Sequence, residues 1–194
     1  LDILKKDDGD FSTMNGLVYR ENGKVIKKIN HGWFGMKGNG SLDDIYPPDL
    51  SIYKNPEKIF KNQTTKASGG MSTRRSPVGS ILTSRGCPYK CSFCASPVTT
   101  GQKMRFRSPE NVLEEIDMLV NDYGVKEIIF QDDEMYADKR RATKIVQMIK
   151  DRNYKDLIWK NLNIASWRMD YEMIKLMKES GCYQITISAE SGNP

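Results

Sequence analysis

Three of the four cysteines in this sequence lie within one eight-residue stretch, at Cys87, Cys91 and Cys94. Thiolates this close together can converge on a single metal ion or on an iron–sulfur cluster. A disulfide framework would spread its cysteines along the chain, so we interpret these three as metal ligands in a reducing compartment. The fourth cysteine, Cys182, lies far away in the sequence, and His31 is the single histidine.

Three thiolate ligands on a four-iron cluster leave one iron open to a small molecule, much as a catalytic zinc keeps one position free. Ferredoxin-type clusters with similar spacing recruit a fourth cysteine, and no fourth cysteine is near this loop. An alternative interpretation is a structural zinc site that His31 or Cys182 completes. A single histidine also leaves little room for Ser-His-Asp catalysis.

The elements around these cysteines alternate between strand and helix. Short apolar stretches predict strands at residues 78–84, 126–131, 158–165 and 183–188. Each intervening helix is predicted to begin after a residue that can cap it, namely Ser108, Asp138 or Asp170. This alternation predicts an α/β fold with right-handed crossovers and a parallel sheet, which is either a barrel or a doubly wound sheet.

Polar residues follow the predicted strands at the end where parallel barrels carry their chemistry. The second strand leads into Asp132-Asp133-Glu134, the third into Arg168, and the fourth into Ser188-Ala189-Glu190-Ser191-Gly192. Carboxylates can accept hydrogen bonds from an ammonium group, and an arginine can hold a carboxylate or another anion. Solvated turns and an exposed arginine are the plainer interpretations of the same residues.

The CxxxCxxC spacing, with Phe93 before the last cysteine, resembles the radical S-adenosylmethionine (SAM) superfamily over residues 78–194. The resemblance implies a partial (βα) TIM-type barrel with parallel strands, represented by its first four βα units. It implies that Cys87, Cys91 and Cys94 bind a [4Fe–4S] cluster, whose open iron SAM chelates. One electron would then cleave SAM to a 5′-deoxyadenosyl radical for C–H activation or methyl transfer on a substrate.

The resemblance also implies contacts with SAM at the ends of the strands. Phe93 matches an aromatic position near adenine, and Glu134 matches the acid of a Gly-Gly-Glu motif that contacts the SAM amino group. Asp132 and Asp133 replace the two glycines, as in the cobalamin-associated branch. The remaining contacts are expected at Arg168, Ser188 and Glu190, the last two in a segment that resembles a Glu-Ser-Gly signature.

Residues 1–75 are rich in Gly, Asn, Asp and Lys, with a predicted hairpin turn at Glu21-Asn22-Gly23. They resemble the tail of an upstream cobalamin-binding domain plus a linker, and residues 76–194 resemble the N-terminal part of a radical SAM core. The Asp-x-His-x-x-Gly cobalamin signature does not occur in the chain. Leu1 is not an initiator Met and Pro194 follows a predicted strand closely, so we expect a fragment of a longer protein.

Two other functions remain open on sequence alone. A methylthiotransferase-type radical SAM enzyme would need a second cluster, and residues 1–75 contain no cysteine. A non-catalytic metal- or cluster-binding module would share the cysteine loop. The resemblance implies a small-molecule substrate, which the sequence does not identify, and a flavodoxin- or ferredoxin-type reductant.

Composition gives weaker indications. A net charge of +5 permits contact with RNA or with anionic substrates and argues for neither. No apolar run is long enough to span a membrane and no signal peptide is evident, so we expect a cytoplasmic protein.

Overall fold

The structure, a computed structural model, describes residues 17–27, 41–45, 49–61, 72–187 and 192. His31, Ser188 and Glu190 lie outside the described residues. The chain divides into two compact units, Leu1–Gly40 and Ser41–Pro194, and each is described by itself below.

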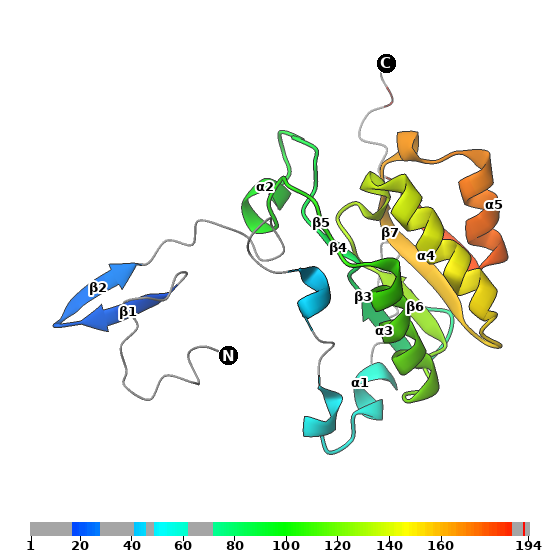
Figure 1. Cartoon of the computed structure of the whole chain (residues 1–194), viewed down its shortest axis with the longest axis horizontal. Helices are drawn as coiled ribbons and strands as arrows, with labels where there is room; N and C mark the ends of the chain where they lie inside the picture. Colours follow the sequence, from blue (N-terminus) through cyan, green and yellow to red (C-terminus); the bar gives the residue numbers. More distant parts are fainter. Residues whose placement is uncertain (1–16, 28–40, 46–48, 62–71, 188–191, 193–194) are drawn as a thin grey trace. The chain divides into compact units, whose positions relative to one another are not determined.

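The first unit contains an antiparallel hairpin of β1 (Val18–Glu21) and β2 (Lys24–Lys27) (Figure 1). Its two turn residues, Asn22 and Gly23, have φ values of 47° and 76°. A two-residue turn with both φ values positive matches the right-handed twist of the flanking strands. The hairpin predicted from the sequence is therefore confirmed.

The second unit is built on a four-stranded sheet in which every neighbouring pair is parallel, in the order β3-β6-β7-β8. These strands are β3 (Val78–Ile81), β6 (Glu127–Phe130), β7 (Ile158–Ile164) and β8 (Cys182–Ile187). The helices between them, α3 (Pro109–Asn121), α4 (Lys139–Arg152) and α5 (Tyr171–Glu179), stack on one face of the sheet (Figure 1). The predicted α/β class with parallel strands is confirmed.

Each of these three helices begins at the cap expected from the sequence. The side chains of Ser108, Asp138 and Asp170 each accept a hydrogen bond from the backbone N–H three residues onward, at 2.9–3.1 Å. Such a bond satisfies one of the N–H groups that a helix start leaves unpaired, and it contributes about 1 kcal/mol. The caps therefore fix where each helix leaves the end of the preceding strand.

The core lies between the helices and the sheet. Its buried side chains come from α3, α4, α5 and the strands, and include Val112, Leu113, Ile116, Ile145, Val146, Ile149, Met173, Met177, Ile128, Phe130 and Trp159. Phe130 and Trp159 meet edge to face, with ring centroids 5.3 Å apart. The indole N–H of Trp159 donates to the Ser180 carbonyl at 3.0 Å, so this large side chain is buried with its polar atom satisfied.

The first strand is shorter than the predicted 78–84. It ends at Ile81, because the backbone N–H of Thr83 donates to the Asp132 carboxylate instead of to a neighbouring strand. The chain then forms β4 (Ser84–Arg85), which pairs antiparallel with β5 (Arg105–Phe106). The fourth strand differs at its other end: it begins at Cys182, one residue earlier than predicted.

The remaining helices are short. They are α1 (Glu57–Lys61), α2 (Ser96–Thr99) and the 3-10 helices η2 (Leu42–Asp44), η3 (Leu50–Ile52), η4 (Met135–Ala137) and η5 (Ser166–Arg168). No helix in the described ranges combines the length and apolar character needed to cross a bilayer.

The residues just before β3 contact both ends of α3, and we call the described residues 41–45, 49–61 and 72–75 the strap. At the first end, Asp43 accepts a 2.7 Å hydrogen bond from the backbone N–H of Ser108. At the other end, Phe60 packs against Tyr123 with ring centroids 5.2 Å apart. The strap thus belongs to the same unit as the sheet, while its predicted origin in an upstream domain stays a prediction.

Candidate functional site

The three clustered cysteines lie in the loop between β4 and α2, which we call the cysteine loop (residues 86–95). All three are free; Cys87 is half-buried, whereas Cys91 and Cys94 are exposed. The backbone N–H of Cys87 donates to the Gly101 carbonyl at 3.1 Å, so the loop is closed at its base. Gly86 has a φ of +93°, and a Cβ there would lie 2.5 Å from the Lys103 carbonyl oxygen. Only glycine fits where the chain enters the loop.

The chemistry of the donor set fits an iron–sulfur cluster. Three thiols lie on one loop, and the backbone N–H of Ser96 donates to the Cys94 sulfur at 3.4 Å. Within the described ranges, no three His, Cys, Asp or Glu side chains converge closely enough to hold a metal ion.

Two acidic residues at the end of β6 lie near this loop. Burial is the main cause that raises the pKa of the Cys87 thiol, and the charges of Asp133 and Glu134 raise it further. Thr100, just after α2, donates a 2.7 Å hydrogen bond from its hydroxyl to the Asp133 carboxylate. The structure therefore brings the acidic run and the cysteine loop together, as the strand-end argument predicted.

Asp132 points into the protein. Its side chain is fully buried, and its carboxylate accepts hydrogen bonds from the backbone N–H and hydroxyl of Thr83 and from the Ser84 hydroxyl. This carboxylate consequently holds the start of the cysteine-bearing segment to the end of β6. A contact between Asp132 and SAM stays a prediction.

A buried arginine completes this junction. Arg141 donates from Nη2 to the Thr83 carbonyl and from Nε to the Arg107 carbonyl, both at 2.6 Å. Its guanidinium carbon lies 5.1 Å from the centroid of the Phe106 ring. Burial lowers the pKa of Arg141 to about 10, although nearby carboxylates, Asp132 first among them, oppose this shift.

Glu134 joins the ends of two strands. Its carboxylate accepts one hydrogen bond from the backbone N–H of Tyr136 and one from that of Ala165, both at 3.0 Å. Burial raises the pKa of Glu134, while these N–H donors and the charge of Arg168 act in the opposite direction. The carboxyl group is thus fixed in place beside the loop and the segment that follows β7.

Arg168 lies in η5, directly after β7, and contacts the cysteine loop. Its Nε donates a 2.9 Å hydrogen bond to the phenol oxygen of Tyr89, and this bond is the main cause that raises the pKa of Arg168. Tyr89 also meets Trp167 edge to face, with ring centroids 5.3 Å apart. Tyr89 was not predicted as a site residue from the sequence, although its hydroxyl lies between two predicted cluster ligands, Cys87 and Cys91.

The other predicted residues are less constrained. Phe93 lies on the cysteine loop with 71% of its surface exposed. The predicted contacts Ser188 and Glu190 lie outside the described residues, although β8 leads towards them. Cys182 begins β8 and pairs with Trp159 in the early part of β7, at the opposite end of the sheet from the cysteine loop. Burial raises the pKa of Cys182 to about 12.

Comparisons with known proteins point in one direction. Residues 81–194, more than half of the chain, match the family model of the radical SAM superfamily. Over 154 residues the chain is 40% identical to the cytidylyl-2-hydroxyethylphosphonate methyltransferase of Streptomyces wedmorensis, covering 79% of this chain and 28% of that protein. Over 182 residues it is 34% identical to an uncharacterized methyltransferase of Pyrococcus horikoshii, covering 92% of this chain and 35% of that protein.

A solved structure shares the fold. The radical SAM methyltransferase TsrM of Kitasatospora setae, solved with tryptophan and a SAM analogue, superposes with a TM-score of 0.63 at 18% identity. The superposition covers 95% of this chain and 34% of TsrM. The chain spans about a third of the length of these relatives. On the match of the family model, which includes the cysteine loop and all the strands that follow it, this chain belongs to the radical SAM superfamily.

Proposed function

We propose that this chain is the SAM-activating part of a radical SAM enzyme and that Cys87, Cys91 and Cys94 hold its [4Fe–4S] cluster. The observation that carries the proposal is the position of the three-thiol loop beside Asp133 and Glu134, at the carboxyl ends of parallel strands. A cluster bound there would supply the electron that cleaves SAM. The superfamily to which the chain belongs uses this cluster and SAM.

The chain's own residues would bind and orient SAM. We assign the SAM ammonium group to Asp133 and Glu134, because carboxylates accept its hydrogen bonds. Arg168 would hold the SAM carboxylate through guanidinium nitrogens that Tyr89 leaves free. Exposed Phe93 would lie against adenine. Ser188 and Glu190 would contact the ribose or the methionyl part, and Asp132 would support these groups from the buried side.

Methyl transfer to a small molecule is the reaction class we propose. Several relatives are named for it, including a hopanoid C-2 methylase of Rhodopseudomonas palustris and a tryptophan 2-C-methyltransferase of Streptomyces laurentii. One TsrM structure holds cobalamin together with a [4Fe–4S] cluster. We therefore propose cobalamin as the methyl carrier, bound by a part of the protein other than residues 76–194.

Two further proposals concern the surroundings of the enzyme. Cleavage of SAM needs one electron, and we propose a flavodoxin- or ferredoxin-type protein as its donor. All four cysteines are free. Free thiols that bind a cluster persist in reducing compartments, which supports a cytoplasmic location.

Anaerobic reconstitution tests the proposal directly. The chain, supplied with iron and sulfide, should bind about four irons, as a [4Fe–4S] cluster requires. With SAM and a chemical reductant it should cleave SAM to methionine and 5′-deoxyadenosine. Cys91→Ala should lose both the cluster and SAM turnover. Cys182→Ala is the matched control and should keep them, because Cys182 lies at the other end of the sheet.

Two results would contradict the proposal. A Cys91→Ala protein that still held a full cluster and turned over SAM would show that the cysteine loop does not bind the cluster. One zinc per chain with no visible absorption would favour a closed structural metal site instead.

A further inference from the structure

A cavity of about 460 Å3 opens beside the cysteine loop, at the end of the sheet that carries the candidate site. It lies between Pro88 of the loop, Phe106 of β5, the first residues of α4 and Arg168 of η5. It is a wide, open hollow, so a molecule bound there would keep one side in solvent. A molecule in this cavity would lie against the loop that bears Cys87.

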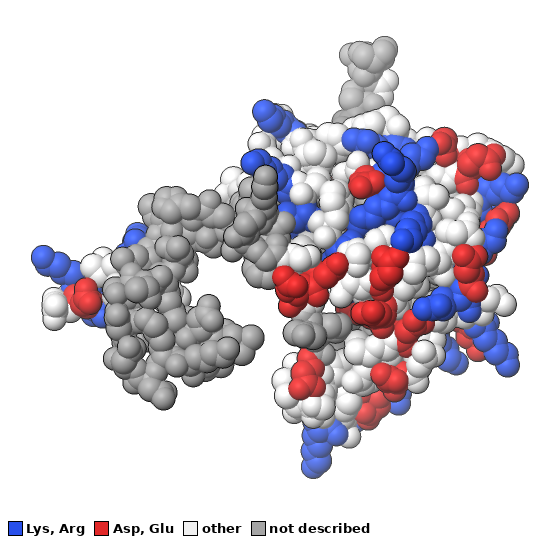
Figure 2. Space-filling view, in the orientation of Figure 1, with Lys and Arg blue, Asp and Glu red and all other residues white. Residues whose placement is uncertain are grey.

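The lining of this cavity is strongly cationic. Lys139, Arg140 and Arg168 line it together with one acid, Asp138. The Asp138 carboxylate caps α4 by accepting the backbone N–H of Arg141, and it forms no ion pair with these three cations, so the lining keeps an excess of positive charge. Figure 2 shows Lys and Arg side chains gathered on this face of the molecule, over the start of α4. An anion would find an excess of positive charge here.

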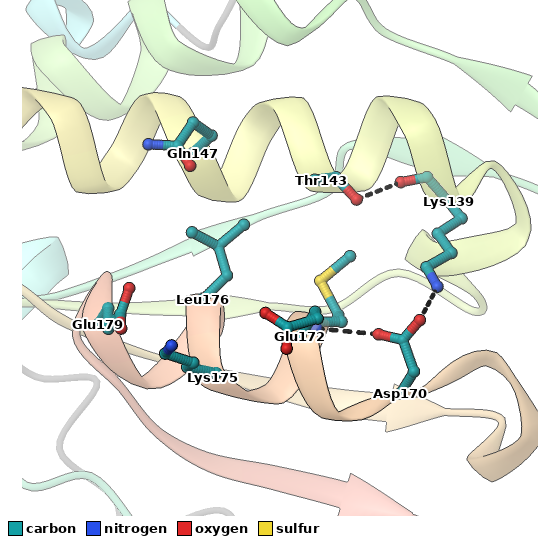
Figure 3. Close-up of a pocket in the computed structure, with 9 residues that line it drawn as sticks. Lys139, Thr143, Gln147, Asp170, Glu172, Lys175, Leu176 and Glu179 are labelled. Atoms are coloured by element: carbon teal, nitrogen blue, oxygen red, sulfur yellow. Dashed lines mark hydrogen bonds and ion pairs between the residues drawn. The ribbon is translucent and has the colours of Figure 1, made fainter.

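Two of the three cations have donors to spare. Lys139 forms an ion pair with Asp170 at the start of α5, as Figure 3 shows. Arg140, by contrast, makes no hydrogen bond or ion pair with any described residue, and among these residues Arg168 uses only its Nε. Guanidinium groups present paired N–H donors that match phosphate and carboxylate oxygens.

The rest of the wall is apolar. Met104, Phe106, Ala137 and Pro88 complete the lining, and Arg141 lies over the Phe106 ring. An apolar wall with a few convergent charged groups is typical of a site for a small organic molecule with one charged end.

A second cavity, of about 390 Å3, offers a contrast (Figure 3). It lies between α4 and α5, and its cations Lys139 and Lys175 are matched by Asp170, Glu172 and Glu179. This groove has no excess of positive charge, and it lies between two helices instead of beside the cysteine loop.

We propose that the cationic cavity beside the cysteine loop binds the anionic group of the substrate, a phosphate, phosphonate or carboxylate, chiefly through Arg140. Arg168 lies at the border with the SAM site and would share its two terminal nitrogens between this anion and the SAM carboxylate, so SAM should weaken binding in the cavity only in part. The apolar part of the substrate would lie against Phe106. The assignment of this anion to the substrate rests on the proposed function, whereas the anion site itself rests on the lining residues alone.

Phenyl phosphate is a suitable probe, because it joins a flat apolar ring to a phosphate. Its binding to the full chain, before cluster assembly, can be measured by calorimetry or by ligand-observed NMR. The double variant Arg140→Gln/Arg168→Gln should weaken this binding by about tenfold or more, which corresponds to the loss of a charged hydrogen bond. Arg152→Gln is the matched control, because Arg152 ends the same helix and pairs with Asp117.

A third variant separates the two parts of the cavity. Phe106→Ala should weaken phenyl phosphate more than inorganic phosphate, because it removes only the apolar wall. Circular dichroism melts show whether each variant is folded, and Arg140→Gln alone, at an exposed position, keeps the test decisive if Phe106→Ala unfolds.

Three outcomes decide the matter. Unchanged binding in the double variant overturns the anion site. Full displacement of phenyl phosphate by SAM overturns the assignment to a substrate, because the cavity would then hold the SAM carboxylate. A chain that binds phenyl phosphate and fails to assemble a cluster overturns the proposed function and leaves the anion site standing.

Discussion

Arg168, in η5 after the end of β7, donates a hydrogen bond of 2.9 Å from Nε to the phenol oxygen of Tyr89, which lies between Cys87 and Cys91. Seventy-nine residues separate the two in sequence. The bond joins the cysteine loop to the segment that we assign to the SAM carboxylate. The positions of the thiols and of the arginine are therefore linked by this contact.

Loss of the Tyr89 hydroxyl should weaken SAM binding. In Tyr89→Phe the guanidinium of Arg168 loses its fixed orientation while the ring contact with Trp167 is kept. A charged hydrogen bond contributes about 1.5–3 kcal/mol when buried, and this one is partly exposed, so we expect a rise in the SAM dissociation constant of about fivefold. Calorimetry on the reconstituted protein measures it. Tyr53→Phe, at an exposed tyrosine, should show no change.

Gly86→Ala should disrupt the cysteine loop. The new Cβ would lie 2.5 Å from the Lys103 carbonyl oxygen, at a backbone φ of +93°. Gly124→Ala is the matched control, because Gly124 also has a positive φ, +63°, and no atom within 4 Å of a built Cβ. We expect Gly86→Ala to lower the free energy of unfolding by about 1–3 kcal/mol more than Gly124→Ala. Urea unfolding measures both, and equal losses would contradict the steric argument.

The raised pKa of Glu134 predicts a pH dependence of stability. Its ordinary value is 4.5, and burial raises the pKa in the folded protein. The folded state therefore holds this proton more tightly, and the stability that this contributes is present below pH 4.5 and lost as the pH rises through the raised value. Glu134→Gln removes the titrating group.

The free energy of unfolding of Glu134→Gln relative to the parent should consequently be higher at pH 7 than at pH 4. Urea titrations at several pH values between these limits test the sign. Glu114→Gln, at an exposed position in α3, should show no such trend. A trend in the opposite direction would mean that the carboxylate form is the one that the fold stabilises.

The rates of thiol alkylation should differ between the exposed cysteines and Cys182. Burial raises the pKa of Cys182 to about 12, so little thiolate forms there at pH 8. Cys91 and Cys94 are exposed. Iodoacetamide should modify these two more than about tenfold faster than Cys182, because the thiolate is the reactive form. Peptide mass spectrometry gives the order, and early modification of Cys182 would show that the start of β8 opens.

Local signals in the sequence predicted much of this fold. The caps at Ser108, Asp138 and Asp170 act between residues three apart, and apolar stretches identify strands without knowledge of their neighbours. The hairpin turn at Asn22-Gly23 is equally local. The cysteine loop and its placement after the first strand of the sheet also follow from spacing alone.

Contacts across long separations were not predictable in this way. The early end of β3 depends on the pairing of Thr83 with Asp132, 49 residues away. That pairing also buries Asp132, which the sequence places in a single run with Asp133 and Glu134. The alternation of strands and helices in the sequence does not indicate which of three consecutive acids is buried. In the structure both Asp132 and Glu134 are buried.

The strap has a consequence for the order of folding. Its contacts close long loops: Asp43 meets Ser108 across 65 residues, Arg74 meets Glu127 across 53, and Ser72 meets Lys160 across 88. Closing a long loop costs conformational entropy, and this cost arises before the contacts that stabilise the closed loop have formed. We therefore expect α3 and the sheet to assemble first and the strap to close on them late. Until it closes, the first turn of α3 lacks the acceptor that Asp43 provides, and the buried side chains of Glu127 and Lys160 lack the hydrogen bonds that Arg74 and Ser72 form with them.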